Sequence, residues 1–339
     1  MWGFPVAVFP VSPPTPVPAS SKPEVLAVAR LHPFYRQALD SLYTVHDRTH
    51  EQDPAAFDAL APRIVGVAAT GEASVPRQLI ERLGAARVVS VFGVGYDGVD
   101  VAAAIGRGIP VTHTPGVLSD DVADMAMALM LGIARRVAEG DRYVRDGRWP
   151  EGPLALGRKV SGARLGIVGM GRIGQAIARR AGAFGMSIAY TARSAKADLP
   201  WAFVPDATTL ARQSDFLVVI TPGGAGTRHL INADVLAALG PQGFLINVAR
   251  GSVVDEEALI AALRDRTIAG AGLDVFANEP HVPEALRQLP NVVLSPHTAS
   301  ATAQTRQDMA DLAFANMRAG IDGQPLITPV PEWVAARGK

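Results

Sequence analysis

Three polar residues of the C-terminal half, Arg250, Glu279 and His297, each come shortly after an apolar run. A guanidinium binds a carboxylate through two parallel hydrogen bonds, which a lysine ammonium cannot do. An imidazole donates a proton near neutral pH, and a neighbouring carboxylate raises its pKa. Together these groups could anchor a 2-keto acid at Arg250 and protonate its carbonyl oxygen from His297, with Glu279 orienting and tuning the histidine. Such a reduction also needs a source of hydride.

A glycine-rich turn predicts the binding site of the hydride carrier. Gly169, Gly171 and Gly174 follow the apolar run 165–168 and open a helical pattern. In a dinucleotide-binding turn, the first glycine permits the sharp bend and the second lets a pyrophosphate approach the backbone. The third lets the helix pack closely on the strand. The free N–H groups at the helix start attract the phosphates, so this motif in this context predicts a nicotinamide dinucleotide site.

The next predicted strand, 187–191, indicates which dinucleotide binds. A site for NAD usually places Asp or Glu about 20 residues beyond the turn, where the acid binds the ribose 2′-hydroxyl. This chain has no acid there, and Arg193 and Ser194 follow the strand instead. A guanidinium and a hydroxyl can hold a 2′-phosphate. We therefore predict NADPH, with NADH as a weaker cofactor. The alternative is that Arg193 is only a solvated surface residue.

Several motifs together resemble the D-isomer-specific 2-hydroxyacid dehydrogenase family. They are residues 169–174, 247–251, 272–280 and 295–297. The resemblance covers essentially residues 24–330 and implies that Arg250, Glu279 and His297 are the catalytic residues. It implies cofactor contacts around the turn and at the strand ends, from Gly169, Gly171, Arg172, Ile173, Gly174, Arg193, Ser194, Thr221, Pro222, Val248, Ala249, Asp274 and Thr298. Asp274 would meet the nicotinamide carboxamide.

Within this family, the chain is most similar to glyoxylate/hydroxypyruvate reductases and to the hydroxyphenylpyruvate reductases beside them. The resemblance implies reduction of glyoxylate or hydroxypyruvate to the D-2-hydroxy acid. Reduction of hydroxyphenylpyruvate or 2-ketogluconate is the alternative, and a dinucleotide-sensing, co-repressor-like interaction protein is the non-enzymatic one. One position departs from the family, because Ala299 stands where a glycine is frequent. The change adds one methyl group near the expected position of the nicotinamide.

The substrate side of the predicted site lies in the first half of the chain. Residues 91–97 end an apolar run and resemble the family's substrate-carboxylate loop, where backbone N–H groups of Val94 and Gly95 would complement Arg250. The family's dimer interface is built around the helix that precedes Trp149, so we expect a homodimer. Trp149 would either reach the partner's active site or pack at the interface. The predicted substrate contacts are Phe92, Gly93, Val94, Gly95, Trp149, Arg250 and His297.

Apolar runs that alternate with helical patterns must position these residues. Strands are predicted at 25–29, 64–68, 88–92, 110–112, 165–168, 187–191, 216–220, 244–248, 270–275 and 292–295. This alternation predicts βαβ units and an α/β fold of two Rossmann-like or flavodoxin-like, doubly wound parallel sheets with a cleft between them. In such sheets ligands bind beyond the carboxyl ends of the strands, where Arg250, Glu279 and His297 would converge.

Two helical patterns connect the predicted domains. One begins at Ser119, expected as a hydroxyl N-cap, and carries an apolar stripe to Val137. The other, 302–319, would return the chain to the first domain. We therefore predict a substrate-binding domain of residues 24–115 and 300–330 and an NADP-binding Rossmann domain of residues 116–299. The proline-rich residues 1–23 are predicted to be a disordered extension.

Composition bounds the remaining possibilities. The chain has 339 residues, equal numbers of basic and acidic residues and no cysteine. Zero net charge gives no electrostatic signature of a nucleic acid or membrane partner, and no apolar run is long enough to span a bilayer. Without cysteine there are no disulfides or thiolate sites, which fits a cytoplasmic protein. The other histidines lack metal-ligand spacing, so we expect no metal.

Overall fold

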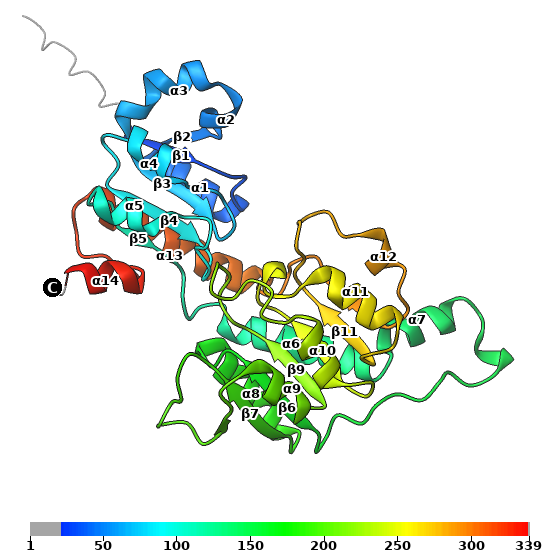
Figure 1. The fold of residues 1–339 in the computed structure, drawn as a ribbon. Coiled ribbons are helices and arrows are strands. Elements are labelled where there is room, and N and C mark those ends of the chain that lie inside the picture. The colour runs from blue at the N-terminus through cyan, green and yellow to red at the C-terminus, as the bar shows by residue number, and fades with distance from the viewer. Residues whose placement is uncertain (1–21, 338–339) are drawn as a thin grey trace, which may run out of the picture.

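A computed structural model describes residues 22–337 and shows two parallel β-sheets in separate parts of the molecule (Figure 1). The first sheet has the strand order β2-β1-β3-β4-β5, which is the flavodoxin-like order. Its strands are β1 (Glu24–Ala27), β2 (Thr44–Asp47), β3 (Ile64–Thr70), β4 (Val88–Phe92) and β5 (Val111–Thr112). The predicted extension at 1–23 lies outside the described residues except for Lys22 and Pro23. Pro23 O accepts a hydrogen bond from Thr44 N at 2.9 Å, so the folded part begins slightly earlier than predicted.

The second sheet has the order β12-β11-β10-β9-β6-β7-β8. Counted from β6, this is the Rossmann order 3-2-1-4-5-6 with β12 added at the edge. Its strands are β6 (Arg164–Val168), β7 (Ser187–Thr191), β8 (Ala202–Phe203), β9 (Phe216–Val219), β10 (Phe244–Asn247), β11 (Gly270–Leu273) and β12 (Val292–Leu294). The neighbouring strands of both sheets pair in parallel, so the predicted fold class is confirmed.

Helices cover both faces of the sheets. They are α1 (Pro33–Leu42), α2 (Thr49–Gln52), α3 (Pro54–Leu60), α4 (Arg77–Arg82), α5 (Val101–Gly106), α6 (Ser119–Ala134), α7 (Val137–Arg145), α8 (Arg172–Ala183), α9 (Ala207–Arg212), α10 (Ala233–Leu239), α11 (Glu256–Arg264), α12 (Glu284–Arg287), α13 (Ala303–Ile321) and α14 (Pro331–Arg337). Among the described residues, no helix has both the length and the hydropathy needed to cross a membrane. One apolar cluster includes buried residues of α6 and α8, and a second includes those of α9, α10 and α11.

Each predicted strand is present, and two edge strands were missed. β2 and β8 each lie at the outer edge of their sheet, and their side chains are exposed or only half-buried. Edge strands of this kind carry no continuous apolar run, so hydrophobic patterning does not detect them. Strands β9 to β12 end one or two residues before the predicted ends. The apolar residues that follow, such as Val248 and Val275, are buried in loops rather than in the ladder.

The start and the end of helix α6 differ from the prediction. Leu118 holds the N-cap position, and Ser119 is already helical, with no hydrogen-bond partner for its hydroxyl among the described residues. The apolar stripe stops at Ile133, because Arg136 adopts a left-handed conformation (φ 56°) and begins a separate helix. Val137 is therefore exposed rather than part of the buried face. The stripe itself packs against α8, β10 and β11.

Helix α13 returns the chain to the first sheet. Thr302 caps it by accepting a hydrogen bond from Thr305 N at 3.2 Å, and the helix packs against α1, β3 and β4 (Figure 1). A Cβ on Gly320 would lie 2.5 Å from Cβ of Val88, so this glycine lets α13 approach β4. Helix α13 thus covers a sheet whose first strand begins at Glu24. The predicted domain boundaries remain a prediction.

Gly320→Ala should lower the stability of the protein, because the new methyl group has no room against Val88. We expect a loss of about 1–3 kcal/mol, typical of an overpacked core, seen as a lower midpoint of thermal unfolding. Gly182→Ala in α8 is the matched control, since nothing lies within 4 Å of its Cβ position. The control should gain up to about 1 kcal/mol from helix propensity. Equal behaviour of the two variants would contradict the close approach of α13 and β4.

Candidate active site

The glycine-rich turn after β6 has the geometry of a dinucleotide-binding loop. Gly169 has a φ of +106°, and a Cβ there would lie 2.5 Å from Ile220 O. A Cβ on Gly174 would overlap the carbonyl oxygen of Gly169. Gly171 differs, because nothing lies within 4 Å of its Cβ position. It is the N-cap of α8 and offers no side-chain cap, so N–H groups of the helix face open space that phosphates could fill.

Two arginines flank this open space. Arg172 begins α8 and Arg193 follows β7, and both are exposed without an ion-pair partner among residues 22–337. The segment after β7 is held in place because the hydroxyl of Tyr190, which is fully buried, accepts a hydrogen bond from Lys196 N at 2.8 Å. Ser194 is exposed beside Arg193. The turn and these exposed side chains fit a nicotinamide dinucleotide, the cofactor class of the predicted site.

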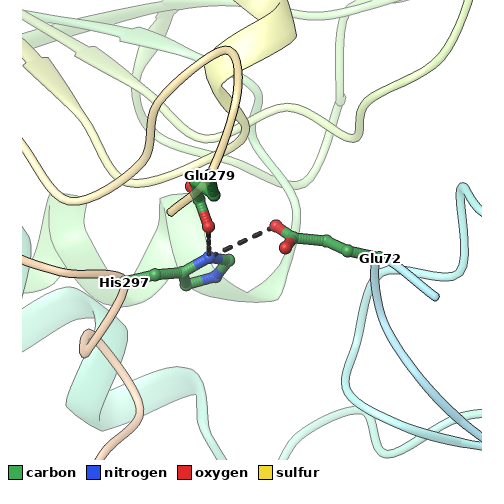
Figure 2. A group of neighbouring side chains, drawn as sticks. All are labelled: Glu72, Glu279 and His297. Carbon is green, nitrogen blue, oxygen red and sulfur yellow. Dashed lines mark hydrogen bonds and ion pairs between the residues drawn. The ribbon is translucent and has the colours of Figure 1, made fainter. Parts of the chain in front are cut away.

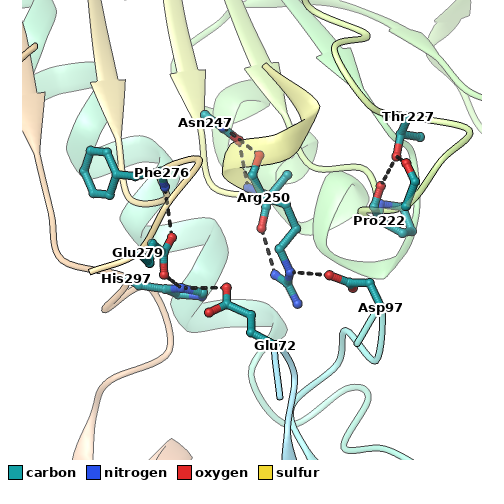
Figure 3. A network of polar contacts seen from close by, with 11 residues as sticks. Glu72, Asp97, Pro222, Thr227, Asn247, Arg250, Phe276, Glu279 and His297 are labelled. Atoms are coloured by element: carbon teal, nitrogen blue, oxygen red, sulfur yellow. Dashed lines mark hydrogen bonds and ion pairs between the residues drawn. The ribbon is translucent and has the colours of Figure 1, made fainter. Parts of the chain in front are cut away.

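The other predicted cofactor residues lie at the same edge of the second sheet. Thr221 and Pro222 follow β9, Val248 and Ala249 follow β10, and Thr298 follows β12. Thr227 closes the loop after β9 by donating its hydroxyl to Pro222 O at 2.7 Å (Figure 3). Ile173 is half-buried in the first turn of α8. Parallel strands carry all these loops to one side, which faces the loops of the first sheet.

The turn that carries Arg250 is held by a buried asparagine. Asn247 Nδ2 donates to Arg250 O at 3.1 Å, and its Oδ1 accepts from Ala249 N at 3.0 Å (Figure 3). Gly251 lies so close to Phe276 that a Cβ there would overlap the Phe276 carbonyl group. The backbone after β10 therefore packs directly on the backbone after β11, and this places Arg250 near the loop that carries Glu279.

The Arg250 side chain reaches the substrate loop of the first sheet. Its Nε donates to Asp97 Oδ2 at 3.1 Å and its Nη1 to Ala249 O at 2.8 Å. A Cβ on Gly95 would overlap Nη2 of Arg250, so only glycine permits this approach. Among the described residues, no hydrogen bond is found for Nη2 or for the N–H groups of Val94 and Gly95. The structure therefore brings together the predicted groups for binding a carboxylate.

His297 and Glu279 form the expected pair. His297 Nδ1 lies 2.7 Å from Glu279 Oε2, and Phe276 N donates to Glu279 Oε1 at 2.9 Å (Figures 2 and 3). Both oxygens of this half-buried carboxylate are thus engaged. The pair raises the pKa of His297 to about 9, chiefly through the hydrogen bond to Glu279 and then through Glu72. The imidazole is therefore held as a proton donor at neutral pH.

Glu72 is a site residue that the sequence prediction missed. It comes from the segment between β3 and α4, and its Oε1 lies 3.2 Å from His297 Nδ1 (Figure 2). The hydrogen bond from His297 is the main cause that holds the pKa of Glu72 below its ordinary value, and Arg250 adds to it. Ligand atoms of Glu72, Glu279 and His297 lie within 4.8 Å of one another. The hydrogen bond of Glu279 and the ion pair of Glu72, both at His297 Nδ1, account for this clustering.

The side chain of Asp274 holds the loop that carries His297. It is fully buried, its Oδ1 accepts from Thr298 N and its Oδ2 from Ala299 N, both at 2.9 Å. Asp274 O also accepts from His297 N at 2.8 Å, while His297 itself adopts a left-handed conformation (φ 53°). The contact to a nicotinamide carboxamide stays a prediction. The hydrogen bonds of Asp274 within the protein position the loop that carries His297.

Two predicted substrate residues lie apart from this cluster. Phe92 is buried, and its ring stacks on His32 and Tyr35 with centroids 5.7 and 5.8 Å away. Trp149 is exposed and follows α7 on an arm that projects from the second domain (Figure 1). The sequence prediction also missed two other residues near the substrate loop, Asp97 and His113. Asp97 binds Arg250, and His113 Nδ1 lies 2.9 Å from Val94 O. Gly93 O accepts a hydrogen bond from Thr114 N.

The family model for the NAD-binding domain of D-isomer-specific 2-hydroxyacid dehydrogenases matches residues 127–299. The chain is 43% identical over 311 residues to a 2-ketogluconate reductase of Gluconobacter oxydans, covering 92% of this chain and 99% of the relative. It is 44% identical over 309 residues to a hydroxyphenylpyruvate reductase of Plectranthus scutellarioides, covering 90% and 98%.

Among solved structures, the chain is similar to an NADPH-dependent glyoxylate/hydroxypyruvate reductase of Sinorhizobium meliloti in complex with NADP and malonate. The TM-score is 0.87 at 45% identity, over 92% of this chain and 98% of the other. Together with the dinucleotide loop and the Arg250, Glu279 and His297 cluster, these matches establish the family. The chain belongs to the D-isomer-specific 2-hydroxyacid dehydrogenases and is an NAD(P)-dependent oxidoreductase.

Proposed function

We propose that the protein reduces small 2-keto acids, with glyoxylate and hydroxypyruvate as the first candidates, to D-2-hydroxy acids with NADPH. The observation that carries this proposal is the pairing of His297 with Glu279 beside an Arg250 whose Nη2 is free of protein partners within residues 22–337. Such an arrangement offers a carboxylate anchor and a proton donor side by side. The family membership and the named relatives support the same reaction class.

In this mechanism, Arg250 and the N–H groups of Val94 and Gly95 bind the substrate carboxylate. The bound dinucleotide supplies a hydride to the carbonyl carbon. As negative charge develops on the carbonyl oxygen, the imidazolium of His297 donates its Nε2 proton and becomes neutral. Glu279 holds Nδ1 and stabilises the charged form before transfer. The product gains one C–H and one O–H bond, and His297 regains its proton from solvent.

For the cofactor, we propose that Arg193 and Ser194 bind the 2′-phosphate of NADPH. Arg193 is exposed and unpaired among the described residues, and no acid of the segment after β7 stands where a ribose hydroxyl would need one. A relative's structure in complex with NADP supports this choice. For the substrate, 2-ketogluconate and hydroxyphenylpyruvate stay alternatives, since similar enzymes are named for them. The cytoplasmic location also stays a prediction.

For the oligomer, we propose a homodimer formed through the projecting arm, which here means residues 137–156 and includes α7. The arm exposes four large apolar side chains, Val137, Val144, Trp149 and Leu156, with exposed fractions between 56% and 95%. Apolar groups gathered on one projecting segment mark a surface that another chain covers. A second copy is the partner that the family resemblance implies. Trp149 of one subunit would then reach the substrate site of the other.

The reductase mechanism predicts a pH profile set by His297. Because its pKa is raised to about 9, the proton donor is present below that pH and is lost above it, so kcat/KM for glyoxylate should fall above about pH 9. Glu279→Gln should move the fall toward the ordinary histidine value of about 6.5. His297→Ala should lower kcat/KM by roughly 10²–10⁴-fold. NADPH oxidation followed by absorbance measures all three.

His281→Ala is the control for these variants, because its side chain is exposed and has no hydrogen bond recorded within the described residues. It should keep the activity and the pH profile of the unmodified protein. Near-normal turnover by His297→Ala would contradict the catalytic assignment.

The NADPH assignment predicts a cofactor-specific loss in Arg193→Ala. A hydrogen bond to a charged group contributes about 1.5–3 kcal/mol, so KM for NADPH should rise roughly 10–100-fold. KM for NADH, which lacks the phosphate, should change less than about threefold, since the variant removes no group that NADH needs. Steady-state kinetics with both cofactors measures the ratio. Equal kcat/KM for NADPH and NADH in the unmodified protein would contradict the proposal.

The dimer proposal predicts an altered substrate preference in Trp149→Ala. If the partner's side chain lines the substrate site, its removal should change the ratio of kcat/KM for hydroxyphenylpyruvate and glyoxylate by about tenfold or more, with kcat for glyoxylate less affected. Val144→Ala, on the same arm, is the control for a general loss of interface contact. An unchanged ratio in Trp149→Ala, with the dimer retained by sedimentation, would exclude a role in the partner's site.

A further inference from the structure

Glu72 places a second carboxylate beside His297, in addition to that of Glu279. Its carboxylate lies between His297 and Arg250 in Figure 3, 3.2 Å from His297 Nδ1. Glu279 already binds the same nitrogen at 2.7 Å, and one N–H cannot make two strong hydrogen bonds at once. Glu72 also comes from the first sheet, whereas His297 and Glu279 come from the second. Orienting the histidine therefore does not require Glu72.

The backbone of Glu72 is fixed rather than loose. Ala73 N donates to Thr70 O at 3.2 Å, and Val75 N donates to Gly98 O at 2.8 Å. A Cβ on Gly98 would overlap Ala73 O, so the two loops are in direct backbone contact. The carboxylate is thus held at the substrate side of the site by the same loop that presents Val94 and Gly95.

The charges around the substrate position do not balance. Arg250 and protonated His297 supply two positive charges, while Glu279, Asp97 and Glu72 supply three negative ones. Arg306 interacts with two acids, Asp274 and Asp121, so it does not offset the charge of Glu72. Without Glu72, the two cations Arg250 and His297 would be balanced by the two acids Asp97 and Glu279. The hydrogen bond from His297 and the nearby Arg250 keep the pKa of Glu72 low, so the excess negative charge persists at neutral pH.

We infer that Glu72 is a specificity-determining residue that selects 2-keto acids by the charge of their far end. Its carboxylate disfavours substrates with a second anionic group and favours those with a neutral or hydroxylated chain. The inference rests on the proposed reductase function and narrows its substrate class. A four-carbon keto acid held at Arg250 and His297 is shorter than the Debye length of about 8 Å. Its far carboxylate therefore interacts with Glu72 in whichever direction it points.

Two substrates of equal shape isolate this effect. Oxaloacetate and its ω-amide, 2-oxosuccinamate, differ only in the charge at the far end. We expect kcat/KM for the amide to exceed that for oxaloacetate at least tenfold in the unmodified protein. Glu72→Gln should reduce this ratio about five- to tenfold. Because both substrates depend equally on His297, any effect of the variant on the histidine cancels in the ratio.

Two further variants serve as controls. Glu72→Asp keeps the charge and should keep most of the ratio. Glu81→Gln removes an exposed charge from helix α4, which follows the segment that carries Glu72. This variant should leave both the ratio and the glyoxylate activity unchanged. Raising the salt from about 0.1 to 1 M should shrink the ratio in the unmodified protein, because the screening length falls to about 3 Å.

The outcomes separate this inference from the proposed function. A ratio that is the same in Glu72→Gln and in the unmodified protein overturns the role of Glu72, whatever the glyoxylate activity. If glyoxylate and hydroxypyruvate are not reduced either, the reductase proposal itself fails. If they are reduced but neither four-carbon acid is, binding tests the inference instead. Calorimetry then measures the binding of oxaloacetate and of 2-oxosuccinamate to the complex with NADP⁺. If the ratio of these two affinities is the same in the unmodified protein and in Glu72→Gln, the inference is overturned.

Discussion

The parallel pairing of β9, β10, β11 and β12 is the constraint on which the site depends. Parallel strands all run the same way, so the residues that follow them leave from one edge of the sheet. Arg250, Glu279 and His297 lie far apart along the chain, yet each needs to turn only a few residues from its strand to meet the others. The glycine turn after β6 opens at the same edge. The glycine turn and the three polar side chains are thereby brought to one edge without long connecting loops.

Close backbone packing then sets the distances within this edge. Gly251 lies against Phe276, Gly95 against Arg250 and Gly174 against Gly169, and a methyl group in any of these places would overlap its neighbour. Buried polar side chains complete the order, since Asn247 holds the turn of Arg250 and Asp274 holds the loop of His297. The short distance between His297 Nδ1 and Glu279 Oε2 is maintained because the backbone segments that carry the two residues are fixed relative to each other.

Ion pairs across the two sheets distinguish the substrate side from the cofactor side. Arg250 meets Asp97 and His297 meets Glu72, so each functional cation of the second sheet has a carboxylate partner from the first. A carboxylate that binds at Arg250 would meet Asp97 at Nε, while Nη2 has no hydrogen-bond partner among the described residues. In these pairs the first sheet contributes the two carboxylates and the second contributes the two cations. This division is the basis for assigning substrate preference to Glu72 rather than to the catalytic residues.

The sequence by itself determined the parallel α/β fold and the glycine turn. It also placed Arg250, Glu279 and His297 at strand ends, because these features lie in local apolar runs and short motifs. The sequence prediction missed the exposed edge strands β2 and β8. It also expected Ser119 at the N-cap of α6, a position that Leu118 occupies. Only the tertiary structure decided that Glu72 and Asp97 belong to the site. Each lies more than a hundred residues from its partner, in a loop whose composition resembles any solvated loop. Their charges acquire meaning only when two separately formed sheets face each other.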